Sequence, residues 1–170
     1  PIVTGAALAA QLDGEGRVAV SFFGEGASNA GPFHESINIA AHWRLPVLYV
    51  CENNQYAISV PLSQQMGVKD LRSRAEGYGL AYAGIDGNDI VTVYESTTEA
   101  VEKARLGEGS TVIEAKVDRY LPHTGDDDDK RYRAQDEIIE ARRHDPLSLL
   151  RDRLTSMTLL SLIHISEPTR

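Results

Sequence analysis

Cysteine is almost absent from this 170-residue chain, which holds a single one, Cys51. One cysteine cannot form an internal disulfide and cannot supply the several thiolates of a structural zinc site. Cys51 stands in an apolar run, where it is most simply a small core residue. The sequence therefore favours a reducing compartment, either the cytoplasm of a bacterium or the mitochondrial matrix of a eukaryote.

Long apolar runs and an excess of basic residues are absent as well. No stretch approaches the roughly 18 apolar residues of a membrane-spanning helix, and the first residues, PIVTGAALAAQL, lack the basic flank of a signal peptide. Seventeen Lys and Arg stand against 25 Asp and Glu, which gives a net charge of -8. Because affinity for nucleic acid depends on Lys and Arg, we expect no nucleic-acid partner. Because no apolar run is long enough to span a bilayer, we expect no membrane partner.

The apolar residues that are present alternate between strand-like and helix-like spacing. Runs rich in β-branched residues predict strands over residues 17–23, 46–51, 80–85 and 110–117, and the first two are predicted to be buried. Helical periodicity predicts helices over residues 4–12, 31–45, 70–78, 90–106, 134–143 and 147–154, with a polar loop over residues 52–59. This alternation predicts an α/β fold of three layers, a mostly parallel sheet with helices on both faces, incomplete at both ends. Ligands are expected beyond the carboxyl ends of the strands.

The domain organisation is predicted to be one domain over residues 1–154. The chain opens within a helical pattern and has no initiator methionine, so we expect an internal fragment of a longer protein. Residues 155–170 abandon the charged helical pattern, and their last part, LIHISEPTR, resembles translated sequencing adapter. We predict that they form a non-native tail.

The tripeptide Gly-Glu-Gly occurs three times, and its context separates the copies. The copies at residues 14–16 and 107–109 lie between a predicted helix and the next strand, where glycine commonly ends a helix. Only the copy at residues 24–26 follows a strand and opens towards a helix, where backbone N–H groups can bind a phosphate. Asn29 stands where the dinucleotide fingerprint needs its third glycine, and no P-loop motif occurs, so NAD and P-loop nucleotide sites are both disfavoured.

A carboxylate, Glu25, lies inside this turn, and Asn53 and Asn54 follow the next predicted strand. Because adjacent parallel strands end at the same edge of a sheet, these side chains are expected to converge. Carboxylate and amide oxygens beside a diphosphate indicate magnesium. Asn54 is the expected ligand, whereas Asn53 is compatible with a simple turn role.

The segment FFGEGASNAGPFHESINIAAHWRLPVLYVCENNQYAIS resembles the thiamine diphosphate motif of the α subunit of 2-oxo acid dehydrogenases, the decarboxylating component. The similarity runs from Pro1 to about Leu154 and implies a thiamine diphosphate-binding fold. It also implies that Mg²⁺ is bound by the Glu25 carboxylate, the Asn54 side-chain oxygen and the Tyr56 carbonyl. The residues that would contact the cofactor are Gly24, Glu25, Gly26, Ala27, Asn54, Tyr56 and His123. Many relatives have aspartate at the position of Glu25, and branched-chain enzymes often have glutamate.

The segment YLPHTGDDDDKRYR, residues 120–133, resembles the family's loop that closes over the cofactor, and its acidic run is nearer the branched-chain form than the pyruvate or acetoin form. By this resemblance His123 is the catalytic histidine, and Thr124 occupies the place of a serine that is phosphorylated in animal relatives. Gly125 departs from the common serine. We expect Arg131 and Arg133 to pair with the acidic run and order the loop.

The resemblance implies decarboxylation of a branched-chain 2-oxo acid, with transfer of the acyl group to a lipoyl acyltransferase. It also implies a β subunit in an α2β2 tetramer, because the family's cofactor-activating glutamate comes from that subunit. Two alternatives stay open: the α subunit of a pyruvate or acetoin dehydrogenase, and a non-catalytic truncated binding module.

Overall fold

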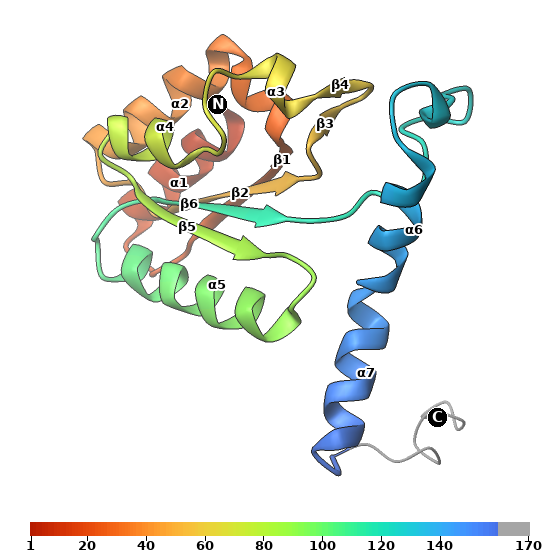
Figure 1. The fold of residues 1–170 in the computed structure, drawn as a ribbon. Coiled ribbons are helices and arrows are strands. Elements are labelled where there is room, and N and C mark those ends of the chain that lie inside the picture. The colour runs from red at the N-terminus through yellow and green to blue at the C-terminus, as the bar shows by residue number, and fades with distance from the viewer. Residues whose placement is uncertain (160–170) are drawn as a thin grey trace.

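A parallel sheet of four strands forms the centre of the computed structural model, which describes residues 1–159 (Figure 1). The strand order is β1-β2-β6-β5, and all neighbouring strands run parallel. Their bounds are β1 (Ala19–Gly24), β2 (Val47–Asn53), β5 (Ala81–Asp86) and β6 (Thr111–Lys116). Each predicted strand is therefore confirmed within two residues. The predicted polar loop also contains a small antiparallel hairpin of β3 (Tyr56–Ala57) and β4 (Val60–Pro61).

The helices precede, connect and follow these strands. The six predicted helices are present as α1 (Ile2–Asp13), α2 (Gly31–His42), α4 (Arg72–Gly77), α5 (Ile90–Arg105), α6 (Gln135–Arg143) and α7 (Pro146–Ser156). Three short helices were not predicted: η1 (Glu25–Asn29), α3 (Leu62–Gln65) and η2 (Asp129–Arg131). Within residues 1–159 no helix has both the length and the apolar character required to cross a bilayer.

The two faces of the sheet are covered by different helices, which confirms the three-layer prediction (Figure 1). On β2, Val47, Tyr49 and Cys51 face a core formed with α1, α2 and α4, whereas Leu48 and Val50 pack on α5. Side chains that alternate along a strand point to opposite faces, so β2 is apolar on both. Burial raises the pKa of the Cys51 thiol, and neighbouring carboxylates raise it further. Cys51 is therefore a neutral core residue, as predicted.

Strand β1 lies at the edge of the sheet and is covered on one face only. Val20 and Phe22 point to the side of α5, but that helix packs on the other three strands, and the two side chains are 42% and 68% exposed. The prediction of a fully buried first strand is therefore wrong for this face. Trp43 is 50% exposed, so it does not belong to the core of the described chain.

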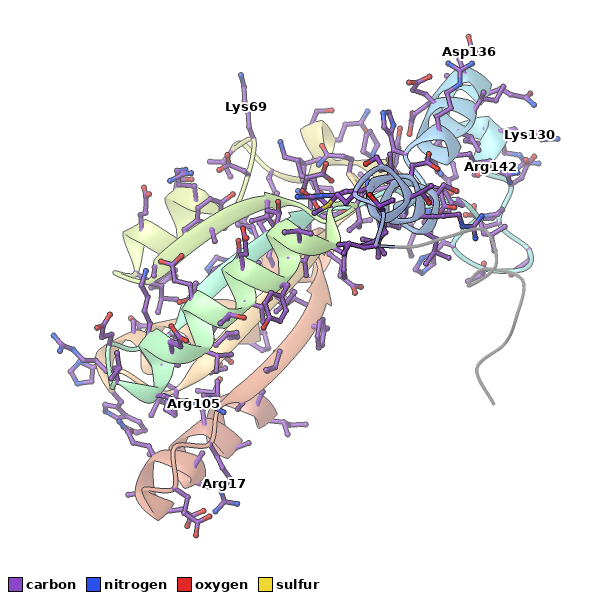
Figure 2. All side chains as sticks on the ribbon, turned by 90° about the horizontal axis from the view of Figure 1, so that it is seen from below. Arg17, Lys69, Arg105, Lys130, Asp136 and Arg142 are labelled. Carbon is purple, nitrogen blue, oxygen red and sulfur yellow. The ribbon has the colours of Figure 1, made fainter. Side chains whose placement is uncertain are left out.

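Helices α6 and α7 extend away from the sheet as an arm that starts beyond the carboxyl end of β6 (Figure 1). In Figure 2 the charged side chains of Lys130, Asp136 and Arg142 surround this arm, while Arg17 and Arg105 lie at the opposite end of the molecule. Helix α7 continues through Thr155 and Ser156, the first residues of the predicted tail. Residues 157–159 of the tail follow the helix, whereas residues 160–170, which include His164, lie outside the described residues, and the tail stays a prediction.

Candidate metal and cofactor site

The turn after β1 and the loop after β2 meet at the carboxyl edge of the sheet. The register pairs Gly24 with Glu52, so the two chains leave the sheet side by side. A Cβ atom on Gly26 would lie only 2.6 Å from Cβ of Ala57, which means that the turn and the hairpin touch at a glycine. The predicted convergence of these two segments is confirmed. The flanking repeats have the other predicted role, since Gly14 and Gly107 adopt the left-handed conformation after their helices, with φ of 69° and 77°.

Glu25 begins η1 and is buried, with 1% of its surface exposed. Its one side-chain hydrogen bond is a long contact of 3.4 Å from Nε2 of Gln65, and within residues 1–159 it forms no ion pair. Oε1 of Gln65 is also buried and has no hydrogen-bond partner in the described chain. An uncompensated buried carboxylate is costly, so this pocket has the oxygen chemistry and the charge that a divalent cation would neutralise.

The turn that carries Glu25 is braced from α4. Ser28 donates its hydroxyl to the Glu25 carbonyl at 2.6 Å. Arg74 donates to the Ser28 carbonyl at 2.8 Å and to the Asn29 side chain at 2.7 Å. Burial lowers the pKa of Arg74. No sequence pattern predicts this brace, because Arg74 lies more than 40 positions from Ser28 and Asn29.

Asn54 and Tyr56 lie in the tight loop between β2 and the hairpin. The side-chain oxygen of Asn54 accepts a hydrogen bond of 3.1 Å from the backbone N–H of Tyr56, which leaves its second lone pair available to a ligand. Gln55 and Ile58 have positive φ values of 70° and 57°, which are uncommon for residues with a side chain. The loop therefore needs support from its surroundings.

Asn53 provides part of that support, so its interpretation as a simple turn residue is incomplete. It is 1% exposed, and its oxygen accepts hydrogen bonds from Gln55, at 2.9 Å from the backbone N–H and 2.8 Å from Nε2. Its Nδ2 donates to the buried carboxylate of Glu114 at 2.5 Å. Sequence reasoning did not identify Glu114, which lies inside a strand where an apolar residue is the usual choice.

His123 lies on the exposed loop between β6 and α6. Its backbone N–H donates to Asp127 at 2.8 Å, and its imidazole makes no hydrogen bond within the part of the chain that the structure describes. Tyr132 donates its hydroxyl to Asp127 at 2.5 Å, and this hydrogen bond lowers the pKa of that carboxylate. The structure thus orders the backbone around His123, and within residues 1–159 no hydrogen bond links its imidazole to the Glu25 turn.

The loop that carries His123 is fastened to the hairpin that carries Tyr56. Arg119 donates to the Ile58 carbonyl at 2.9 Å, and the Tyr56 hydroxyl donates to Glu137 at 3.0 Å. The rings of Tyr56 and Tyr132 lie 5.8 Å apart. Through these contacts the predicted catalytic loop and the predicted metal loop form one packed unit.

Two arginines pair with the acidic run, as predicted. Arg131 lies 3.3 Å from Asp128. Arg133, with a side chain that is 3% exposed, lies 3.8 Å from Asp129 and 3.0 Å from Glu137. A buried guanidinium with two carboxylate partners restrains a loop more than an exposed ion pair does. Arg133 therefore contributes more than Arg131 to the order of this loop.

A cavity of about 630 Å³ opens beside the hairpin, and one of its lining residues, Met66, accepts a hydrogen bond from Ser28 of the Glu25 turn. Its lining includes Tyr56, Leu62, Met66 and Lys69, and the Lys69 side chain extends away from the sheet in Figure 2. Within residues 1–159 no three His, Cys, Asp or Glu side chains are grouped so that they could hold a metal ion by themselves. A cation at this edge would therefore be held by a mixed set of carboxylate, amide and carbonyl oxygens.

Comparison with known proteins places these features in one family. The family model described as "Dehydrogenase E1 component" matches residues 1–163. The 2-oxoisovalerate dehydrogenase subunit alpha of Bacillus subtilis (strain 168) is 45% identical over 161 residues, which are 95% of this chain and 49% of that protein. The 3-methyl-2-oxobutanoate dehydrogenase subunit alpha of Mycobacterium tuberculosis (strain CDC 1551 / Oshkosh) is 41% identical over 92% of this chain and 43% of that protein.

The pyruvate dehydrogenase E1 component subunit alpha of Staphylococcus aureus (strain Mu50 / ATCC 700699) is 42% identical over 84% of this chain and 39% of that protein. Among solved structures, a "putative thiamin diphosphate-dependent enzyme" from Mycobacterium smegmatis superposes with a TM-score of 0.51 and 26% identity, over 69% of this chain and 21% of that one. The chain thus spans about half, or less, of the length of these curated relatives.

Proposed function

Because this chain belongs to the dehydrogenase E1 component family, we propose that it is part of the α subunit of a thiamine diphosphate-dependent 2-oxo acid dehydrogenase. The name of the M. smegmatis neighbour supports the cofactor. The observation that carries the proposal is the buried, uncompensated Glu25 carboxylate at the point where the turn and the hairpin touch.

In this proposal Glu25, the Asn54 side-chain oxygen and the Tyr56 carbonyl hold Mg²⁺, which binds the diphosphate, and Gly24, Gly26 and Ala27 line that diphosphate. The mixed oxygen set and the missing counter-charge of Glu25 support the fit. The chemistry that thiamine diphosphate supplies when bound is that of an electron sink for decarboxylation. The chain's own contribution is to anchor, orient and shield the reacting groups.

His123 is proposed to donate a proton, or a hydrogen bond, from its imidazole to the reacting substrate. The ordered backbone around it and the ties of its loop to the Tyr56 hairpin support this role, because they hold the loop beside the proposed metal site.

The proposed substrate is a branched-chain 2-oxo acid. Two relatives named for such acids cover more of this chain than the pyruvate relative does, and the acidic loop resembles the branched-chain form. The similar identity of the pyruvate relative keeps that enzyme class, together with the acetoin type, as the second candidate. The proposed partners are a β subunit in an α2β2 tetramer and a lipoyl acyltransferase, in the cytoplasm or the mitochondrial matrix.

The test measures cofactor binding by calorimetry in the complete α subunit assembled with its β subunit. We expect binding of thiamine diphosphate to require Mg²⁺. Glu25→Gln should weaken it more than about 100-fold, since loss of a mere supporting residue at a metal site costs about 10–100-fold. Glu52→Gln is the matched control, because Glu52 is exposed and lies beside Gly24 at the same sheet edge.

Unchanged affinity in Glu25→Gln would refute the ligand assignment, and the absence of any Mg²⁺-dependent binding by the unmutated assembly would favour the non-catalytic binding module. Decarboxylation rates of the unmutated assembly with pyruvate and with 2-oxoisovalerate then separate the two substrate classes.

A further inference from the structure

A second buried carboxylate, Glu114, lies outside the proposed ligand set. It is on the inner strand β6 and is 1% exposed. Its Oε1 accepts a hydrogen bond from Asn53 Nδ2 at 2.5 Å, and its Oε2 accepts from the Leu71 N–H and the Tyr82 hydroxyl, both at 2.7 Å. All three partners donate, so the site is built for an acceptor with two oxygens. Burial raises the pKa of the Tyr82 hydroxyl, and the hydrogen bond to the Glu114 carboxylate raises it further.

A carboxylate at this position is not explained by stability alone. A well-packed apolar residue inside a sheet is usually at least as stabilising as a buried charge. The three donors come from three separate segments, namely the end of β2, the start of α4 and strand β5. Strands β2 and β5 already flank β6 in the sheet, so the connection that the sheet does not supply is the one from Glu114 to the start of α4.

The first connection leads to the loop of Asn54 and Tyr56. Glu114 fixes the amide of Asn53, whose oxygen holds both the backbone N–H and the side chain of Gln55. Gln55 has a φ of 70°, a conformation that a residue with a side chain adopts only when it is held there. Without this anchor the loop would be free to relax.

The second connection leads to the turn of Glu25. Glu114 accepts from Leu71 at the start of α4. One turn later Arg74 donates to Ser28, which in turn donates to the Glu25 carbonyl. One carboxylate is thus linked to both segments that carry the proposed ligands.

We infer that Glu114 is a positioning residue that fixes the Glu25 turn and the Asn54–Tyr56 loop relative to each other. The inference rests on the proposed function, because it concerns the same metal site. Glu114 contacts Asn53 and Leu71, and neither of these belongs to the proposed ligand set.

The test exploits the direction of the Asn53 bond. In Glu114→Gln the amide oxygen can still accept from Leu71 and Tyr82, so its NH₂ group faces the NH₂ group of Asn53. Adding Asn53→Asp removes that conflict, because the new amide at position 114 then donates to the new carboxylate at position 53, which still accepts from Gln55. We expect Glu114→Gln to weaken Mg²⁺-dependent binding of thiamine diphosphate about 10–100-fold, and the double variant to recover to within about threefold of the unmutated assembly.

Hydrogen exchange in the cofactor-free assembly provides a readout that does not depend on the ligand. The Gln55 and Tyr56 amides should exchange faster in Glu114→Gln and return to the original rate in the double variant. Ser110→Ala is the matched control, because it removes a buried hydrogen bond, 2.8 Å from Ser110 to the Leu45 carbonyl, at the other end of β6.

The inference would be overturned if Glu114→Gln bound thiamine diphosphate as tightly as the unmutated assembly, or if the double variant bound it no more tightly than the single one. Glu25→Gln would still test the ligand assignment separately. If Glu114→Gln does not fold, the double variant decides: its recovery of fold and binding supports the inference, and its failure to bind overturns it. If the unmutated assembly binds no cofactor, the exchange rates alone decide about Glu114.

Discussion

Gly26 sets the distance between the turn that carries Glu25 and the hairpin of β3 and β4. Its backbone touches Ala57, and an added Cβ would lie 2.6 Å from the Ala57 Cβ, closer than packed carbon atoms approach. Gly26→Ala should therefore push the hairpin away and cost about 1–3 kcal/mol of the free energy of unfolding, as overpacking does. Urea denaturation of the chain measures this cost.

Gly31→Ala is the control for this substitution, because Gly31 has open space around its Cα and begins α2 close by. We expect its free energy of unfolding to change by less than about 0.5 kcal/mol, as at other surface positions. Equal stability of the two variants would mean that the hairpin can move away from the turn without cost.

At the same scale the sequence suggests the proposed ligands Glu25 and Asn54, but not the residues that support them. Glu25 and Asn54 could be found because each follows a predicted strand, and the ends of adjacent parallel strands converge. Asn53, Arg74 and Glu114 could not, because their partners are distant in sequence and are selected by packing. A buried charge inside a strand contradicts the apolar pattern that identifies the strand, so only coordinates reveal its use.

At the scale of elements, the order of the loop between β6 and α6 depends on the carboxylate of Asp127, which accepts hydrogen bonds from two of its residues. The hydrogen bonds from Tyr132 and from the His123 backbone lower the pKa of Asp127. Because the folded pKa is the lower one, the stabilisation is fully present above the ordinary aspartate value of about 3.9 and is lost as the pH falls through the folded pKa. The loop should therefore stay ordered at neutral pH and loosen only in strong acid.

Asp127→Asn tests this dependence. The amide is a weaker acceptor than the carboxylate, so the His123 amide should exchange with solvent faster than in the unmutated chain at pH 7, and the difference should shrink in acid, where Asp127 is protonated. Hydrogen exchange of the two proteins at matched pH measures it. Asp126→Asn is the control, because Asp126 is exposed on the same run. A difference that is the same at every pH would contradict the role assigned to the Asp127 charge.

Periodicity predicted the long elements well and the short ones not at all. Helices and central strands of six or more residues repeat their apolar positions often enough to be recognised. The hairpin β3–β4 has two residues per strand, and its turn contains Ile58 in a conformation that its residue type disfavours. Such a turn is stabilised by the Arg119 contact from another loop, which local sequence cannot reveal.

At the scale of the whole molecule, the net charge bears on the proposed metal site. The chain has a net charge of -8, and the carboxylate of the turn, Glu25, is buried. A diphosphate brought to an acidic turn in an acidic protein would be repelled without a cation between them. Mg²⁺ is thus expected to contribute charge as well as geometry.

Within the described chain both faces of the sheet are covered by helices, except that one face of β1 is exposed. The stability of variants on the two faces of β1 measures this difference. Phe23 packs against Phe33 with ring centroids 5.2 Å apart, whereas its neighbour Phe22 is 68% exposed on the opposite face. The sequence run RVAVSFF predicts burial of both, because apolar content alone does not tell an edge strand from a central one. Phe23→Ala should cost about 3 kcal/mol of the free energy of unfolding, and Phe22→Ala no more than about 0.5 kcal/mol.

The two variants remove the same atoms from adjacent positions of one strand, so each is the control for the other in urea denaturation of the 170-residue chain. An equal and large loss in both would mean that the face of β1 with Val20 and Phe22 is covered, in conflict with its observed exposure. If only the Phe23 variant loses stability in this chain, repeating the pair in the proposed α subunit assembled with the proposed β subunit tests whether the rest of that assembly covers Phe22. A loss of stability that appears for Phe22→Ala only in that assembly would mean that a segment other than residues 1–159 covers this face of β1.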